Sequence, residues 1–373
     1  MDTCIYSKQP FVSATREHIL QNFLGARWES AHIVCNDVQA TFAVTIDKAL
    51  ETGLEELRVL LGTEGGRGGD GPSHKVKTVN GRTLLLQPGG IAKLAEPVVR
   101  PSGDKPGHYD FELPSAKDIG WAVTKVLDME PKADKAALTA QLNELVANAE
   151  RTELDPNDPM HLQLGLGGDL FLRGALKAVF NLLGVNNAKI ALTGDFDAVR
   201  RYVLDGTGDS RQFVRWPVGA ASGLPRRGDF DHFIAVYSRS GTVQGFIQFF
   251  GTYSWIFRLA SAYAGAEFCY SYVVDPLRAA VPAEIRNPLT GSAKLPSFQD
   301  GRERQDEDVR RHVQARLETF LNNFYSRSET MAAIEGALGH ADGRRLTEDD
   351  LDRLSKALAA LALRRLGIAD DGA

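Results

Sequence analysis

Residues 4–50 form the most informative stretch of this sequence: CIYSKQPFVSATREHILQNFLGARWESAHIVCNDVQATFAVTIDKAL. Within it Cys4 and Ser7 lie three positions apart, and so do His32 and Cys35. Two such pairs, separated by a connection of this length, have the spacing of a tetrahedral zinc site, although serine is not a usual zinc ligand. The pattern therefore indicates a small metal-stapled unit in which one ligand position is irregular.

The end of this stretch predicts an amphipathic helix, because its apolar residues recur every four positions. They are Val38, Phe42, Ile46 and Leu50. Asp47 lies beside this apolar face, where an ionised carboxylate is costly unless it is paired or bound to a metal ion. An acid–histidine pair, Glu17 and His18, precedes the helix, so the sequence places three residues of the kind that meet around a hard divalent cation.

In their order, these segments resemble the HNH endonucleases, specifically the subgroup with two Cys-x-x-Cys pairs that frame the active site. The resemblance is carried by Cys4-Ile5-Tyr6-Ser7, Arg16-Glu17-His18-Ile19-Leu20, Leu24-Gly25, His32-Ile33-Val34-Cys35-Asn36 and Phe42-Ala43-Val44-Thr45-Ile46-Asp47-Lys48-Ala49-Leu50. A shorter likeness to the longer members of that group continues at Phe196–Tyr202 and Gly206. The resemblance implies a ββα fold that holds one metal ion and hydrolyses a phosphodiester bond.

The resemblance also implies a role for each matching residue. His18 is expected to be the general base, with Asn36 bracing the loop that orients it. Glu17 and Asp47 are expected to bind one divalent cation, Mg²⁺, Mn²⁺ or Ni²⁺, which stabilises the developing charge.

A structural zinc ion is the second metal that the resemblance implies, with Cys4, His32 and Cys35 as its ligands. Here the sequence departs from the family pattern, because Ser7 and His32 stand where the family has cysteines. The zinc site is therefore either Cys-His-Cys with a water molecule or lost. Gln21 replaces the family's proline, and Ala26 and Ala43 replace glycines.

Composition and charge bear on two further questions, namely where the protein could contact DNA and in which compartment it is found. The net charge is −5, so contact with DNA requires a local basic surface. The best candidates are Arg200, Arg201, Arg211, Arg215, Arg226 and Arg227, although a solvated face with no ligand explains the same residues. Three cysteines favour a reducing cytoplasm, the acidic residue at position 2 argues against a secretory signal, and no apolar run is long enough for a membrane span.

The predicted fold class is α+β, with a small N-terminal ββα-metal motif, a larger region containing an antiparallel sheet, and a helical C-terminus. The predicted divisions are 1–62 for the HNH motif, 63–74 for a Gly-rich linker, 75–300 for a recognition or regulatory region, and 301–373 for C-terminal helices packed on it. The expected β-structure is a hairpin at 75–86 and an antiparallel meander over 231–275, which a loop over 276–302 follows. The expected helices cover 115–128, 133–150, 169–183, 195–204 and 303–325, and a last helix begins with a capping box at Thr347–Asp350.

The predicted function is a metal-dependent HNH endonuclease that cleaves DNA, in defence against foreign DNA. Two alternatives stay open: a catalytically silent protein that binds nucleic acid or another protein, and a nuclease gated by a small ligand in the C-terminal region. A polar pocket beneath the 231–275 sheet would favour gating, and a solid core there would count against it. A homo-oligomer is also left open.

Overall fold

The computed structural model describes residues 1–12, 14–65, 71–102, 107–148, 160–161, 165–217, 223–277, 283–303, 306–339 and 346–365. It combines helices with antiparallel sheets and ends in two helices, so the α+β class is confirmed. Most of the Gly-rich stretch at 65–72 and the expected turn at 155–159 lie outside the described residues.

The largest element is a six-stranded antiparallel sheet in the order β11-β14-β13-β12-β15-β16. Its strands are β11 (Val214–Arg215), β12 (His232–Arg239), β13 (Thr242–Phe249), β14 (Tyr253–Ala260), β15 (Cys269–Val274) and β16 (Glu284–Arg286). The meander prediction is correct for β12 to β14 but wrong for β15, which pairs with β12 at the opposite edge. The edge beside β14 is already taken by β11, so the chain returns across the sheet. The predicted 276–302 loop contains β16.

Each face of this sheet packs into a hydrophobic core. Because successive side chains of a strand point to opposite faces, neighbouring residues belong to different cores. One face carries Ile234, Val236, Ile247 and Trp255 into the main hydrophobic core, and the other carries Phe233, Ala235, Tyr237 and Phe246 into a second core that includes Phe298. Helix α5 (Asp169–Asn186) contacts β12, β13 and β15. These packed layers count against a ligand cavity beneath the sheet.

The N-terminal part has two short antiparallel pairs followed by two helices. β1 (Asp2–Thr3) pairs with β2 (Pro10–Phe11), and β3 (Glu17–His18) pairs with β4 (Glu29–Ser30). Helices α1 (Asn36–Val44) and α2 (Ile46–Leu61) bury the predicted apolar face, with a break at Thr45. This part shares the main core with α5 and the sheet, so the predicted boundary after residue 62 is not a boundary of the core.

Helix α5 continues past Gly184, where the sequence predicts its end. The glycine serves packing instead of capping. A β-carbon at this position would lie 2.6 Å from Ile5 Cδ1, so only glycine allows α5 to approach the N-terminal segment this closely. The C-cap residue is Asn187.

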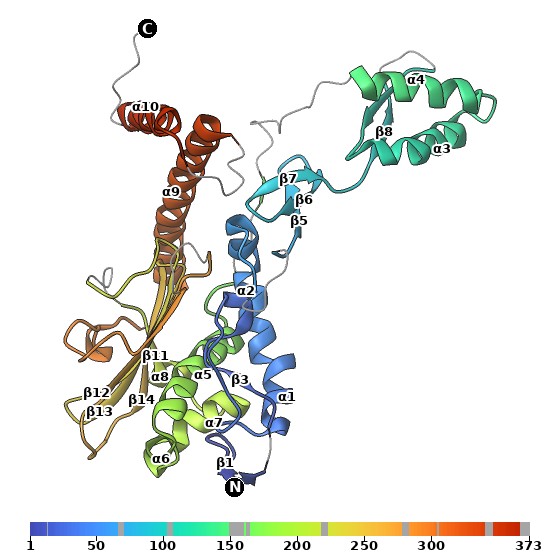
Figure 1. The fold of residues 1–373 in the computed structure, drawn as a ribbon. Coiled ribbons are helices and arrows are strands. Elements are labelled where there is room, and N and C mark those ends of the chain that lie inside the picture. The colour runs from blue at the N-terminus through green and yellow to red at the C-terminus, as the bar shows by residue number, and fades with distance from the viewer. Residues whose placement is uncertain are drawn as a thin grey trace.

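A smaller unit follows α2. The predicted hairpin is present as β5 (His74–Thr78) and β6 (Thr83–Gln87), with Gly81 at a φ of 82°, and β7 (Ile91–Leu94) and β10 (Met160–His161) extend its sheet. β8 (Val98–Pro101), β9 (Tyr109–Glu112), α3 (Ile119–Met129) and α4 (Lys135–Asn148) then build a lobe with its own core. Figure 1 shows this lobe beyond β5–β7, away from the six-stranded sheet.

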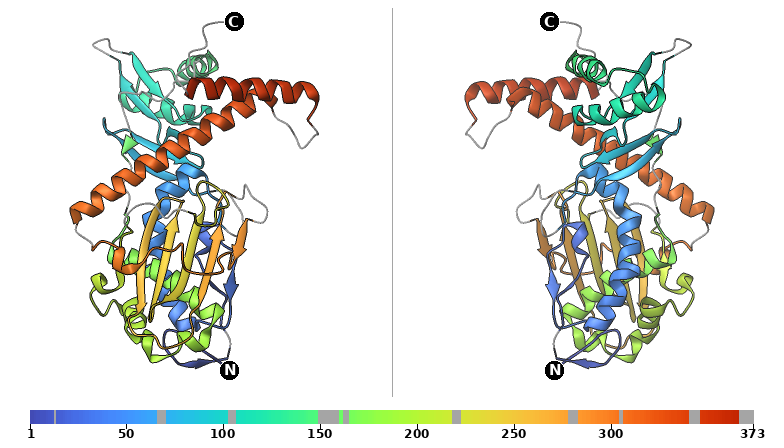
Figure 2. Two further views of the ribbon diagram at one scale, coloured as in Figure 1. Left: turned by 90° about the vertical axis from the view of Figure 1, so that its left-hand side faces the viewer. Right: turned by 90° about the vertical axis from the view of Figure 1, so that its right-hand side faces the viewer.

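The remaining helices are α6 (Ala188–Ala191), α7 (Asp197–Asp205), α8 (Ser210–Phe213), α9 (Asp306–Leu338) and α10 (Glu348–Arg365). Of these, α6 and α7 pack against α5, α8 packs against β14, and α10 packs against α9. Figure 2 shows α9 crossing one end of the sheet, where Phe320 packs against Phe230 and Phe250. The predicted capping box at Thr347 and Asp350 is present. Among the described residues, no helix is both long and apolar enough to cross a bilayer.

Candidate functional site

Four residues singled out in the sequence line one pocket. Glu17, His18, Asn36 and Asp47 surround a cavity of about 670 Å³, and Lys177 forms part of the same wall. Because this lysine comes from α5, the pocket joins the N-terminal segment to a helix 130 residues beyond Asp47 in the chain. The lysine was not a sequence-predicted site residue.

The close approach of two helices brings the charged groups together. Gly174 lies one turn before Lys177 on α5, and a β-carbon there would lie 2.6 Å from the Ile46 carbonyl oxygen of α2. Since glycine removes this obstacle, α2 and α5 pack nearly backbone to backbone. Asp47, the next residue on α2, thereby comes within reach of Lys177.

The Lys177 ammonium lies between the two predicted metal ligands. Its Nζ is 2.6 Å from Glu17 Oε1 and 2.6 Å from Asp47 Oδ2, and it stands 5.2 Å from the centre of the Phe42 ring. The lysine side chain is 1% exposed. Burial by itself lowers the pKa of Lys177, but Asp47 and Glu17 outweigh that effect and hold this pKa above its ordinary value. The two carboxylates thus stabilise the charged form of this buried amine.

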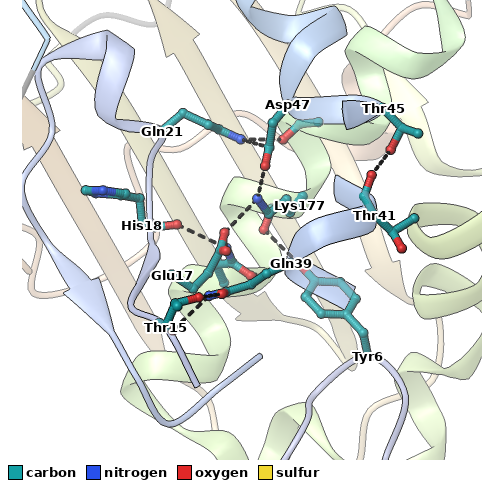
Figure 3. Close-up of polar contacts among 12 residues, drawn as sticks. Tyr6, Thr15, Glu17, His18, Gln21, Gln39, Thr41, Thr45, Asp47 and Lys177 are labelled. Atoms are coloured by element: carbon teal, nitrogen blue, oxygen red, sulfur yellow. Dashed lines mark hydrogen bonds and ion pairs between the residues drawn. The ribbon is translucent and has the colours of Figure 1, made fainter. Parts of the chain in front are cut away.

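Neutral side chains complete the network around this cation (Figure 3). Asn181 Nδ2 donates to Glu17 Oε1 at 3.0 Å, and the Tyr6 hydroxyl donates to Asn181 Oδ1 at 2.8 Å. Gln21 Nε2 donates to Asp47 Oδ1 at 2.9 Å. Burial and the nearby charge of Glu17 raise the pKa of Tyr6, so its hydroxyl remains a donor. Each partner thus helps to hold a carboxylate in place.

This arrangement does not fit the divalent cation that the resemblance implies. Three of the four carboxylate oxygens of Glu17 and Asp47 already accept from Lys177, Asn181 or Gln21. The ammonium also repels a second cation at the same place. Among the described residues, no group of three or more His, Cys, Asp or Glu side chains is placed to hold a metal ion.

His18 lies on the opposite side of its strand from Glu17. Figure 3 shows its ring pointing away from Lys177 and the carboxylates. Its Nε2 is 3.7 Å from Glu29 Oε2, and the other oxygen of Glu29 accepts from Arg16 at 2.8 Å. The His18 side chain is 16% exposed and both ring nitrogens are buried. The imidazole therefore faces Glu29 and not the Lys177 ammonium.

Asn36 lies at the start of α1 and contacts the segment that precedes Glu17. Its Oδ1 accepts a hydrogen bond from the Thr15 amide at 2.8 Å, and Gln39 Nε2 donates to the Thr15 carbonyl at 3.0 Å. Two side chains of one helix thus hold the backbone that leads into β3. This is the geometry expected of a brace, and a role in catalysis stays a prediction.

Of the predicted zinc ligands, Cys4 and Cys35 lie close together and His32 lies apart. Cys4 is buried, and Ser7 Oγ lies 3.9 Å from Cys35 Sγ, whereas His32 is 75% exposed with its Nδ1 2.8 Å from Asp2 Oδ2. Burial raises the pKa of Cys4, but hydrogen bonds from Ser7 and from backbone amides outweigh it and lower that pKa. Two thiols and a hydroxyl, with the imidazole turned elsewhere, do not fit a tetrahedral zinc ion.

The predicted arginine surface is divided among separate partners. Arg200 is 2% exposed, and its guanidinium donates to the Ile5, Ala191 and Thr193 carbonyls and to Asp197, so it is not available to a nucleic acid. Three others pair with acids of their own: Arg211 with Asp209, Arg215 with Glu303, and Arg226 with Asp231. Arg201 is exposed and Arg227 is partly buried.

Sequence reasoning missed Lys177, Asn181, Gln21 and Glu29. A signal existed for the first two, because a lysine and an asparagine one turn apart share a face of a mostly apolar helix, which also carries Asp169 and Arg173. Charged and amide side chains at such positions need buried partners. Comparison of this chain with protein-family models, curated proteins and solved structures found no match.

Proposed function

We propose that this chain is an HNH-type endonuclease that cleaves phosphodiester bonds of DNA at the pocket around His18. One observation carries the proposal: Glu17, His18, Asn36 and Asp47, which are scattered over the N-terminal segment, all line the same cavity of about 670 Å³. The proposal includes a cytoplasmic location and a role in defence against foreign DNA, which its cysteine content and the family resemblance support.

The pocket offers the groups that such a reaction needs. Arg16 and Lys48 line it with side chains that are 71% and 63% exposed, so they are positioned to attract a phosphate backbone. His18 takes a proton from water, the water oxygen attacks phosphorus, and the bond to the leaving oxygen breaks. The leaving oxygen takes a proton from solvent and His18 returns its proton to solvent, so one water is consumed per bond. Because both ring nitrogens are buried, the imidazole must turn toward the pocket when DNA binds.

A catalytically silent DNA-binding protein is the second candidate. Two observations favour it: the Lys177 ammonium already lies between the predicted metal ligands, and the His18 ring contacts Glu29 instead of the pocket interior. In that case the N-terminal segment serves as a binding surface. The two candidates differ in whether DNA is cut or only bound.

Conversion of supercoiled plasmid to nicked or linear DNA tests the proposal. Wild type is compared with His18→Ala and with His108→Ala, which removes an exposed imidazole from the distant lobe. Each protein is assayed with EDTA and with Mg²⁺, Mn²⁺ or Ni²⁺. Cleavage by wild type and His108→Ala, lost in His18→Ala, supports the nuclease.

Two results overturn the proposed nuclease. Equal cleavage by all three proteins points to a contaminant or to a different active site. Absence of cleavage by folded wild type under every condition favours the silent binder, which fluorescence anisotropy with labelled duplex DNA then checks. Binding by wild type that is unchanged in His18→Ala is the result expected of that second candidate.

A further inference from the structure

We propose that Lys177 is the resident cation of the Glu17–Asp47 site, and that removing its ammonium opens this site to one hard divalent cation. In the natural chain the site therefore keeps its structure without a metal ion. The inference depends on packing and charge alone and stands whether or not the chain cleaves DNA. It also accounts for the presence of two apparent metal ligands at a place that does not fit a metal.

The position of the ammonium is the first argument. Lys177 Nζ lies 2.6 Å from one oxygen of each carboxylate, which is where a cation shared by two acids must lie. With the Glu17 side chain 9% and Asp47 22% exposed, solvent does little to screen either charge. A buried and a partly buried carboxylate this close together would be strongly unfavourable without a cation, so the lysine supplies what a metal otherwise supplies.

The construction of the cage is the second argument. The ammonium and the three groups around it come from four elements: Lys177 from α5, Glu17 from β3, Phe42 from α1 and Asp47 from α2. Gly174 permits the close packing of α2 against α5 that closes this cage. Such a site is built into the core and is not a chance surface ion pair.

The third argument is an oxygen with no partner. Gln21 is 6% exposed, its Nε2 donates to Asp47, and its Oε1 is buried with no hydrogen-bond partner among the described residues. Carboxylate and amide oxygens are the ligands that hard divalent cations prefer. Once the ammonium is removed, Glu17 and Asp47 offer oxygens around the vacated space, and a turn of the Gln21 amide, whose nitrogen now faces Asp47, would bring its Oε1 there.

Titration with Mn²⁺, followed by the electron paramagnetic resonance signal of the free ion, tests the proposal. The proteins are wild type, Lys177→Met, Lys177→Met/Asp47→Asn, and the matched control Lys48→Met. Lys48 is exposed at the same pocket, so its replacement removes the same charge outside the cage. Lys177→Met is expected to bind one Mn²⁺ at least about tenfold tighter than wild type, with this gain lost in the double variant and absent in Lys48→Met.

Two outcomes overturn the proposal. One is stoichiometric Mn²⁺ binding by wild type that is lost in Asp47→Asn, because the site then takes a metal despite the lysine. The other is a folded Lys177→Met protein that binds Mn²⁺ no better than Lys48→Met. If Lys177→Met does not fold, Lys177→Gln provides the same comparison, and the wild-type titration decides the first outcome in any case.

Discussion

Replacing Lys177 by methionine should destabilise the protein far more than replacing Lys48. Lys177 pairs at 2.6 Å with the buried carboxylate of Glu17 and at 2.6 Å with the partly buried carboxylate of Asp47, whereas Lys48 forms one exposed pair with Glu51 at 2.9 Å. Removing one partner of a buried ion pair costs about 3–5 kcal/mol, because the charge left behind has lost its hydration and its partner. Removing one partner of an exposed pair costs about 1 kcal/mol or less.

Urea unfolding followed by tryptophan fluorescence measures this difference. Trp28, Trp216 and Trp255 lie in the main core, whereas Trp121 belongs to the separate lobe. Measurements in a Trp121→Phe background therefore report only the core that contains Lys177. We expect Lys177→Met to lower the free energy of unfolding by at least about 2 kcal/mol more than Lys48→Met.

Equal unfolding midpoints for the two variants, at equal slope, would refute the reasoning. A second comparison isolates the charge from the lost packing. Adding Glu17→Gln to Lys177→Met removes one of the stranded carboxylates, and it should recover part of the loss. In the natural background the same Glu17→Gln change should destabilise, since it removes a partner of the lysine.

Three further predictions concern particular sites. Gly184→Ala should lower the free energy of unfolding by about 1–3 kcal/mol, because its methyl group would lie 2.6 Å from Ile5 Cδ1. Gly120→Ala has open space around it and should leave the free energy of unfolding unchanged or raise it by up to about 1 kcal/mol in the same urea assay. His232 is fully buried, and burial lowers its pKa from 6.5 to about 3. The unfolded chain therefore takes up a proton as the pH falls below about 6.5 while the folded chain does not, so this histidine should remove about 3 kcal/mol of stability between pH 7 and pH 4. His232→Gln should flatten this part of the pH–stability curve, and an unchanged slope would contradict that assignment. Thr347→Ala should cost about 1 kcal/mol at the start of α10, seen as faster amide exchange in its first turn, because the hydroxyl accepts from Asp350 N at 3.2 Å.

Local patterns were sufficient for most of the elements. The recurrence of Val38, Phe42, Ile46 and Leu50 predicts a buried helical face, and Asn80-Gly81 predicts the hairpin between β5 and β6. These predictions succeeded because they depend on neighbours a few residues apart. The β-strand over 269–274 was predicted, but its partner was not, since strand order depends on which edge is already occupied.

Glycines show the same limit of local sequence patterns, which do not record contacts with distant parts of the chain. Gly184 has the residue type of a helix end, yet α5 continues through it because Ile5, far away in the sequence, packs against its α-carbon. No local pattern distinguishes a glycine needed for its backbone angle from one needed for space. Only the packed structure shows which atom a side chain would meet.

From the sequence alone, the resemblance to the HNH endonucleases predicted that Glu17, His18, Asn36 and Asp47 share one site, and in the structure all four line one pocket. Only the tertiary structure decided what lies between the two acids. Lys177 is 130 residues from Asp47 in the chain, and its ammonium reaches the carboxylates through the close contact of α2 and α5. Charge compensation in a buried site depends on distance in space, which local sequence patterns do not record.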